Sequence, residues 1–253
     1  MISMMLTLCL GLITSVVSGD ETINQTVDPN LKLELSQRQD QALSGAVFAR
    51  SIESMDVFHR EEAILAEILK GNIPGFLREL VAVETGMTIE DTRYKLTFFV
   101  MPDYISIGSD ADHFLIPMTP ILAQKVVDHM GAVLPTRKMV DLIRNASEVK
   151  LSPQPIPPSP EMVTIDIFQE HNSMVELSRS LFISEHPLGS LVSGHKKDVV
   201  LSNQIISKPD KVIIYGWHYR NGEPIQPLYS GHVNWYADYS HGIRIILNCK
   251  SSK

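Results

Sequence analysis

The proline-rich segment 151–160, LSPQPIPPSP, constrains the fold of this chain more than any other sequence feature. It carries five prolines in ten residues. Proline lacks a backbone N–H donor and has a fixed φ angle, so this segment cannot form a helix or a central strand. Such a composition is typical of an extended linker. It separates a mixed α/β part, residues 37–150, from a β-rich part, residues 161–253, which carries the candidate site.

Apolar periodicity and capping residues predict helices on both sides of this linker. Thr119-Pro120 and Thr136 each place a capping residue in front of an apolar helical face. Gly71 and Gly131 follow two of the faces and are typical helix stops. The expected helical segments are 35–55, 61–70, 119–131, 137–146 and 162–180.

Runs of aromatic and β-branched residues predict the strands. Before the linker the clearest run is 94–101, YKLTFFVM, followed by shorter runs at 104–108 and 113–118. Beyond the linker the expected strands are 188–201, 211–217, 227–239 and 242–247. These elements predict an α+β fold, with N-terminal helices and a short sheet, then a mainly antiparallel C-terminal β-sheet packed on the last helix.

The N-terminus has the pattern of a secretory signal peptide at residues 1–19, followed by a polar linker at 20–36. The apolar run 4–17 is too short for a comfortable membrane span, so we expect no stable membrane insertion after cleavage. An uncleaved anchor is the alternative. Of the two cysteines, Cys9 leaves with the signal and Cys249 stays, so no internal disulfide is expected. The sequence thus predicts a secreted or periplasmic protein.

The charge balance restricts the class of partner. The chain has a formal net charge of −7, and its longest basic cluster is Lys196-Lys197. Nucleic acids and anionic membranes are bound by basic surfaces, so we expect neither as a partner. The expected partner is an envelope polymer or a small-molecule ligand.

Polar residues suited to acid/base chemistry gather in the β-rich part. Imidazoles titrate near neutral pH, and clusters of them serve proton transfer or metal binding. Four histidines that hydrogen-bond separately, inside or at the surface, are the alternative. The candidate catalytic residues are His195, Lys197, Asp198, His218, His232, Asp238, Ser240 and His241.

A metal site is one reading of these residues. His195, Asp198 and His218 supply the ligand types of a divalent metal such as zinc that keeps a water in its fourth position. The neighbouring lysines argue against a cation and favour an anionic group or a general acid. A strand also places residues 195 and 198 on opposite faces, so this site requires a turn or bulge between them.

Three further residue types suggest a hydrolase that binds an acidic or sugar-containing substrate. Ser240 as a nucleophile needs a base from elsewhere, from His232 or His195, because no G-x-S-x-G elbow is present. Arg244 suits a carboxylate, with a surface ion pair as the alternative. Three aromatic residues suit stacking on sugar rings, with a place in the sheet core as the alternative, namely Trp217, Tyr219 and Trp235.

The segment Ser240-His241-Gly242-Ile243-Arg244 resembles the active-site motif of the L,D-transpeptidases, in which Ser-His-Gly is followed by the catalytic cysteine, an apolar residue and arginine. The cysteine is absent here, so the resemblance does not carry over the covalent chemistry. The pieces 193–195 and 217–218 resemble the D-Ala-D-Ala metallopeptidases, although the aspartate spacing differs. The whole chain also resembles uncharacterised secreted bacterial proteins.

Together these features predict an exported hydrolase with a His/Asp/Lys site in the C-terminal region, acting on peptidoglycan or another envelope polymer. A non-catalytic glycan- or peptide-binding envelope protein is the alternative. A third possibility is a structural envelope protein whose histidines satisfy hydrogen bonds in the core. A hydrolase requires several of these side chains to converge in a cleft.

Overall fold

The computed structural model describes residues 31–252. The expected signal peptide and most of the polar linker that follows it lie outside these residues. Within them the fold is α+β, as the sequence predicts. None of the helices in the described part has both the length and the hydrophobicity to span a bilayer.

The helices begin where side chains satisfy free backbone N–H groups. Asp56, Thr119, Thr136 and Thr164 each accept a hydrogen bond from the first turn of a helix, as N-cap residues do. The helices are α2 (Gly45–Ser51), α3 (Val57–Leu69), α4 (Pro120–His129), α5 (Arg137–Ala146), α6 (Ile165–Ser180) and the short α7 (Gln204–Ser207), with 3-10 turns η1 (Gly75–Arg78) and η2 (Pro160–Val163).

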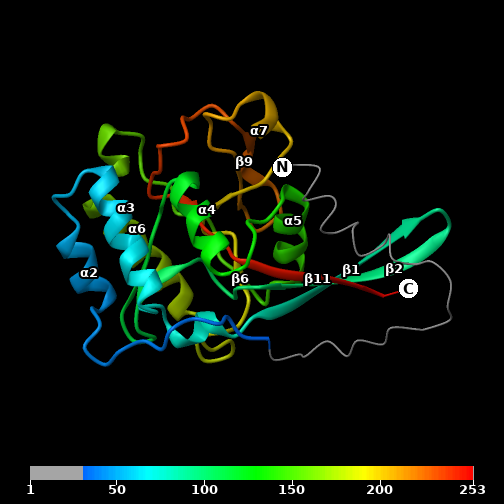
Figure 1. Cartoon of the computed structure of the whole chain (residues 1–253), viewed down its shortest axis with the longest axis horizontal. Helices are drawn as coiled ribbons and strands as arrows, with labels where there is room; N and C mark the ends of the chain where they lie inside the picture. Colours follow the sequence, from blue (N-terminus) through cyan, green and yellow to red (C-terminus); the bar gives the residue numbers. More distant parts are fainter. Residues whose placement is uncertain (1–30, 253) are drawn as a thin grey trace.

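A long hairpin forms the first sheet. Strands β1 (Val81–Ile89) and β2 (Thr92–Val100) pair antiparallel, and β11 (Ile246–Ser252) pairs with the other edge of β2. Figure 1 shows the hairpin extending from the body on the side opposite α2 and α3. The sequence patterns predict β2 but not β1. Glu90 and Asp91 close the hairpin with positive φ angles, as two-residue hairpin turns require.

The second sheet carries the polar residues. Its strand order is β10 (His241–Gly242), β7 (Lys197–Val199), β8 (Ile214–His218) and β9 (Pro224–Tyr229). β10 pairs with β7 in parallel, whereas the other pairs are antiparallel. Two small sheets complete the fold, antiparallel β3 (Ser106–Gly108) with β4 (His113–Leu115), and parallel β5 (Val149–Lys150) with β6 (Val192–Ser193).

The expected strand 227–239 is wrong over most of its length. β9 ends at Tyr229, and residues 230–240 are irregular apart from an isolated bridge at Val233. The Asp238 side chain accepts hydrogen bonds from the backbone N–H and hydroxyl of Ser240. This local turn competes with the ladder of a sheet and bends the chain away from it. His232 and Asp238 therefore lie on a loop.

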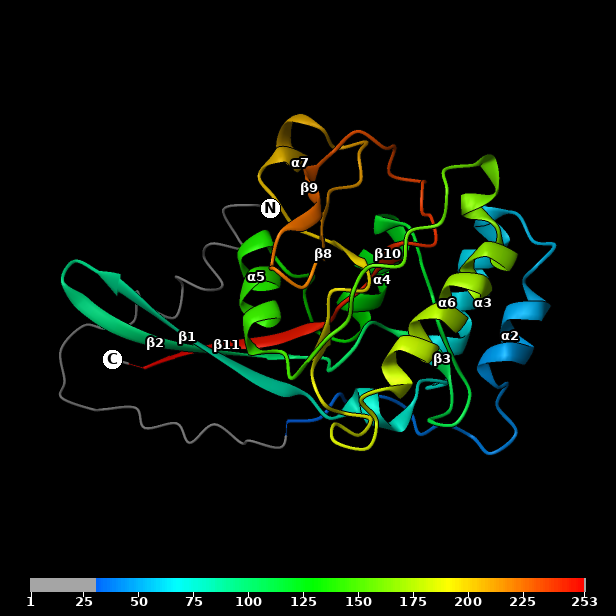
Figure 2. The same cartoon turned by 180° about the vertical axis from the view of Figure 1, so that it is seen from behind.

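The parts on either side of the proline-rich segment share one core. Its buried members include Phe48 and Ile68 from the N-terminal helices, Phe168 from α6, Ile214 from β8, and Ile245 from the link between β10 and β11. Figure 2 shows α6 beside α3 and α2. Its His171 also reaches the second sheet, where the imidazole lies edge-on to the Trp217 ring of β8 with centroids 6.4 Å apart. Helix α5 packs on β8 of that sheet. The segment 151–160 is extended and is held in place by two hydrogen bonds between Ile156 and the hydroxyl of Tyr239.

We expect Phe99→Ala to lower the free energy of unfolding by about 3–5 kcal/mol, because the substitution leaves a cavity in the core. Phe99 is 1% exposed and lies on β2, next to β11. The matched control is Phe58→Ala, since Phe58 is 72% exposed and its loss should cost within about 0.5 kcal/mol. Urea unfolding followed by circular dichroism measures both. Equal losses in the two variants would contradict the placement of Phe99 in the core.

Candidate functional site

Strand β7 and the residue before it place three charged side chains in or beside the interior. Lys196 and Asp198 are buried, and Lys197 is half-buried. Successive strand residues point to opposite faces, so Asp198 and Lys197 meet different neighbours. Two groups of residues result. We call Asp103, Tyr104, His195, Asp198 and Arg244 the inner cluster, and Lys197, His232, Tyr236, Asp238 and His241 the outer cluster.

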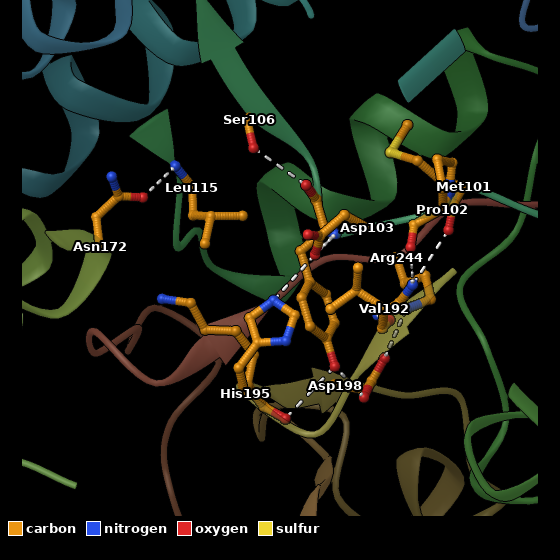
Figure 3. Close-up of polar contacts among 12 residues, drawn as sticks. Met101, Pro102, Asp103, Ser106, Leu115, Asn172, Val192, His195, Asp198 and Arg244 are labelled. Atoms are coloured by element: carbon orange, nitrogen blue, oxygen red, sulfur yellow. Dashed lines mark hydrogen bonds and ion pairs between the residues drawn. The ribbon is translucent and has the colours of Figure 1, made fainter. Parts of the chain in front are cut away.

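Arg244 anchors the inner cluster through main-chain carbonyl oxygens (Figure 3). Its guanidinium donates to Met101 O at 3.1 Å, Pro102 O at 3.3 Å and Val192 O at 2.8 Å. It also lies 4.1 Å from the centre of the Tyr104 ring. Arg244 is 1% exposed, so it joins the ends of β2 and β6 and does not face solvent as a substrate ligand.

The carboxylates of the inner cluster are held by neighbours distant in sequence. Tyr104 Oη donates to Asp198 Oδ2 at 2.8 Å, and Arg244 Nε lies 3.7 Å from Asp198 Oδ1. His195 Nε2 lies 2.9 Å from Asp103 Oδ1 (Figure 3). Burial raises the pKa of Asp198 to about 6, although Arg244 and Tyr104 act against this rise. The inner cluster is therefore a polar core that is paired apart from two atoms, since His195 Nδ1 and Asp198 Oδ1 have no hydrogen-bond partner within residues 31–252.

Lys196 lies between the two clusters. Its ammonium donates to the carbonyl oxygen of Tyr239 and lies 3.2 Å from Nδ1 of His171 on α6. Burial lowers the pKa of Lys196 to about 7 and also lowers the pKa of His171, which stays neutral and accepts the bond. A Cβ at Gly242 would lie 2.6 Å from the Tyr104 ring and 2.8 Å from Lys196 Cβ. Only glycine allows this close approach of β10.

His241 and Lys197 are paired residues on adjacent parallel strands, and they form the centre of the outer cluster. His241 is 1% exposed, and neither ring nitrogen has a hydrogen-bond partner within residues 31–252. Burial lowers the pKa of His241 to about 4, while Asp238 opposes the shift. Lys197 Nζ lies 5.0 Å from the centre of the buried Trp217 ring. Unpaired buried polar atoms are rare in proteins and mark candidate sites.

Asp238 is the anion of the outer cluster. It accepts from the backbone N–H and hydroxyl of Ser240, and from Tyr236 Oη at 3.1 Å. Burial acts to raise the pKa of Asp238, but the charges of His241 and Lys197 and the Ser240 bonds lower it to about 2. The Ser240 hydroxyl is thus bonded to a carboxylate rather than a histidine, so the structure does not assemble a serine–histidine pair at this position.

Aromatic rings connect the outer cluster to the surface. The His232 ring stacks on Tyr236 with centroids 4.3 Å apart, and Tyr236 meets His241 edge-on at 5.9 Å. Tyr236 also lines an open hollow of about 350 Å³ together with Trp235, which is 57% exposed. His241 therefore lies one side chain behind this hollow.

The structure does not bring the four predicted histidines to one point. His232 and His241 flank the same tyrosine, but His195 belongs to the inner cluster. His218 lies apart, with Nε2 3.6 Å from Asp141 Oδ1. The predicted metal triad of His195, Asp198 and His218 is therefore not assembled, and the described residues contain no group of three such side chains arranged to hold a metal ion.

The predicted aromatic residues have three different environments. Trp217 is buried in the main core, Tyr219 is 52% exposed beside the β8–β9 turn, and Trp235 borders the hollow.

The sequence patterns do not predict several residues in or beside the two clusters as site residues. They are Asp103, Tyr104, His171, Lys196 and Tyr236. No local pattern marks these residues, because their partners lie far away in the chain or on an irregular loop.

No family model, no curated protein and no solved structure matches this chain. Its function is therefore inferred from the geometry of the two clusters.

We expect His241→Asn to reduce the loss of stability at acid pH. The pKa of His241 falls from 6.5 to about 4 on folding, so between these values only the unfolded chain binds the proton and folding stability decreases as the pH falls. The variant should lose less between pH 7 and pH 4, by on the order of 3 kcal/mol, in urea unfolding. The pKa of Asp198 is raised by folding in the wild-type protein and in the variant alike, so its contribution cancels in the comparison. Equal losses would count against a buried, neutral His241.

Asp198 and Arg244 should be strongly coupled. Arg244→Met leaves the Asp198 carboxyl buried beside an apolar side chain, which should cost about 3–5 kcal/mol. In a double-mutant cycle with Asp198→Asn, each variant loses part of the free energy of unfolding. The sum of the losses in the two single variants should exceed the loss in the double variant by about 1–3 kcal/mol. The control cycle uses Lys32→Met and Glu79→Gln, an exposed 2.7 Å pair whose coupling should stay below about 1 kcal/mol. Similar coupling in both cycles would refute the role of the inner cluster.

Proposed function

We propose that this protein is an exported hydrolase whose outer cluster cleaves a bond in peptidoglycan or another cell-envelope polymer by general acid–base chemistry. One observation carries the proposal. A buried histidine with both ring nitrogens unpaired among the described residues lies on the strand next to a lysine, with an ionised aspartate beside them. A neutral imidazole beside a cation and an anion has what a proton-transfer site requires.

Three residues of the outer cluster take part in the proposed reaction. His241 takes a proton from a water molecule, the resulting hydroxide attacks the scissile bond, and the same proton passes to the leaving group. The Lys197 ammonium stabilises the negative charge that develops on the carbonyl oxygen of an amide or ester, or on the departing oxygen of a glycosidic bond. The Asp238 carboxylate stabilises the protonated imidazole, in agreement with its raising effect on the pKa of His241.

Access to His241 runs past Tyr236. This side chain lines the hollow and contacts His241 edge-on, and it belongs to the irregular segment 230–240. Rotation of this one ring opens His241 to a substrate in the hollow. Loops without ladder hydrogen bonds are where such gating motions usually occur.

The resemblance of residues 240–244 to the L,D-transpeptidases favours an envelope polymer as substrate, but the chemistry differs. Ile243 follows Gly242 where that family has its catalytic cysteine, and Ile243 is fully buried in the core. Without a thiolate the proposed reaction uses water directly and forms no covalent intermediate on a cysteine.

Binding without catalysis is the second candidate. The exposed Trp235 at the edge of the hollow favours it, because aromatic faces stack on sugar rings whether or not a bond is cleaved. A protein of this kind would retain an envelope polymer and release no fragment from it.

Release of soluble fragments from dye-labelled peptidoglycan and from a panel of other envelope polymers tests the proposal. We expect His241→Gln and Lys197→Met each to lower kcat by about 100-fold or more, because each removes a group that acts in the transition state. The control is His129→Gln, an exposed histidine at the end of α4. Retention of a polymer by folded wild-type protein with no fragment detected by mass spectrometry would instead establish the binding protein.

A further inference from the structure

The hollow beside the outer cluster has a buried cation in its lining. It is lined by Arg60 of α3 and Thr164 at the start of α6, as well as by Trp235 and Tyr236. Arg60 is 7% exposed, which is unusual for an arginine without a carboxylate partner. None of the contacts of Arg60 within residues 31–252 is an ion pair at hydrogen-bonding distance.

The guanidinium of Arg60 is held in one orientation. Nη1 donates to the Val163 carbonyl oxygen at 3.0 Å, and Cζ lies 5.2 Å from the centre of the buried Phe168 ring. Nε is buried and has no hydrogen-bond partner among the described residues. An orientation fixed in advance and an unused donor are what an anion receptor requires, because little rotational freedom is lost on binding.

A helix end adds a second source of positive potential. Helix α6 has 16 residues, and its N-cap Thr164 and first residue Ile165 line the same hollow. The free N–H groups at a helix N-terminus carry partial positive charge and favour anions. Arg60 and this helix end therefore act on the same part of the hollow, where a carboxylate can accept hydrogen bonds.

The aromatic part of the lining suits a sugar ring. Trp235 is 57% exposed, and its indole face can stack on the apolar face of a pyranose. Glu53 borders the same hollow from an exposed position and can accept hydrogen bonds from hydroxyl groups. A volume of about 350 Å³ lies in the range of small-ligand sites.

We propose that this hollow binds a sugar residue that carries a carboxylate, with Arg60 receiving the carboxylate and Trp235 stacking on the ring. The substrate class of the proposed hydrolase is then an acidic glycan, and this assignment rests on the proposed function. A sugar in the hollow brings its neighbouring bond to Tyr236, next to His241. The carboxylate source is either a lactyl-substituted amino sugar, as in peptidoglycan strands from which the peptide has been removed, or a uronic acid.

The test is binding, measured by the fluorescence of Trp235 and by calorimetry. The ligands are a muramic-acid disaccharide, a uronic-acid oligosaccharide, and the carboxyl-reduced form of each. All proteins carry His241→Gln, so that turnover cannot consume the ligand. We expect Arg60→Gln to weaken binding of one acidic ligand at least about 10-fold and to leave its reduced form unaffected, as loss of one charge-assisted contact should.

Three further variants separate recognition from folding. Arg60→Lys keeps the charge and should restore part of the affinity, whereas Arg50→Gln, an exposed arginine on α2, should change nothing. Trp235→Ala should weaken the acidic and reduced ligands by a similar factor. Thermal melting of each variant checks the fold. If Arg60→Gln does not fold, the affinity of Arg60→Lys is compared with that of the parent protein that carries only His241→Gln.

The outcomes distinguish this inference from the proposed function. Charge-selective binding that depends on Arg60, with no turnover by wild-type protein, supports the site and refutes the hydrolase. Turnover with equal affinity for acidic and reduced ligands refutes the site and leaves the hydrolase in place. Affinity unchanged by Arg60→Gln, or no binding of either acidic ligand up to about 10 mM, overturns the inference.

Discussion

The fold depends on placing three consecutive charged residues, Lys196, Lys197 and Asp198, inside a protein of ordinary size. Buried charges are costly unless each finds a partner, so the neighbouring elements must supply one. Lys196 donates to the Tyr239 carbonyl oxygen and to His171. Asp198 accepts a hydrogen bond from Tyr104 and lies near the guanidinium of Arg244. These partners come from β10 and its flanks, from α6 and from the β2–β3 connection. The short strand β7 therefore fixes how those elements meet.

The two faces of this strand serve different purposes. In the inner cluster most polar groups are paired, and Arg244 alone donates to three carbonyl oxygens. In the outer cluster His241 is as deeply buried but has no partner for either ring nitrogen among the described residues. A paired network rigidifies a core, whereas unpaired groups beside a hollow are available for chemistry. We infer that the inner cluster holds β10 in position and that the outer cluster performs the proposed acid–base chemistry.

The Ser-His-Gly segment shows how sequence similarity and geometry can diverge. Gly242 allows β10 to approach Tyr104 and Lys196, and Ser240 bonds to Asp238, so two of the three residues have roles in local structure. The two ring nitrogens of His241 have no hydrogen-bond partner within residues 31–252, and the same holds for Nε1 of the neighbouring Trp217. The proposed chemistry thus rests on one residue of the motif, with Lys197 supplied by the adjacent strand and an acidic glycan held by the hollow through Arg60 and Trp235.

The sequence by itself determined the α+β class and the helices that Thr119 and Thr136 cap, because periodicity and capping act within a few residues. It did not determine β1, the loop at 230–240 or the division of the histidines. Tyr104 meets Asp198 across 94 positions, and Asp103 meets His195 across 92. Such pairs, like the parallel register of His241 with Lys197, follow from how whole elements pack. Only the tertiary structure could decide which buried charges are paired and which remain free.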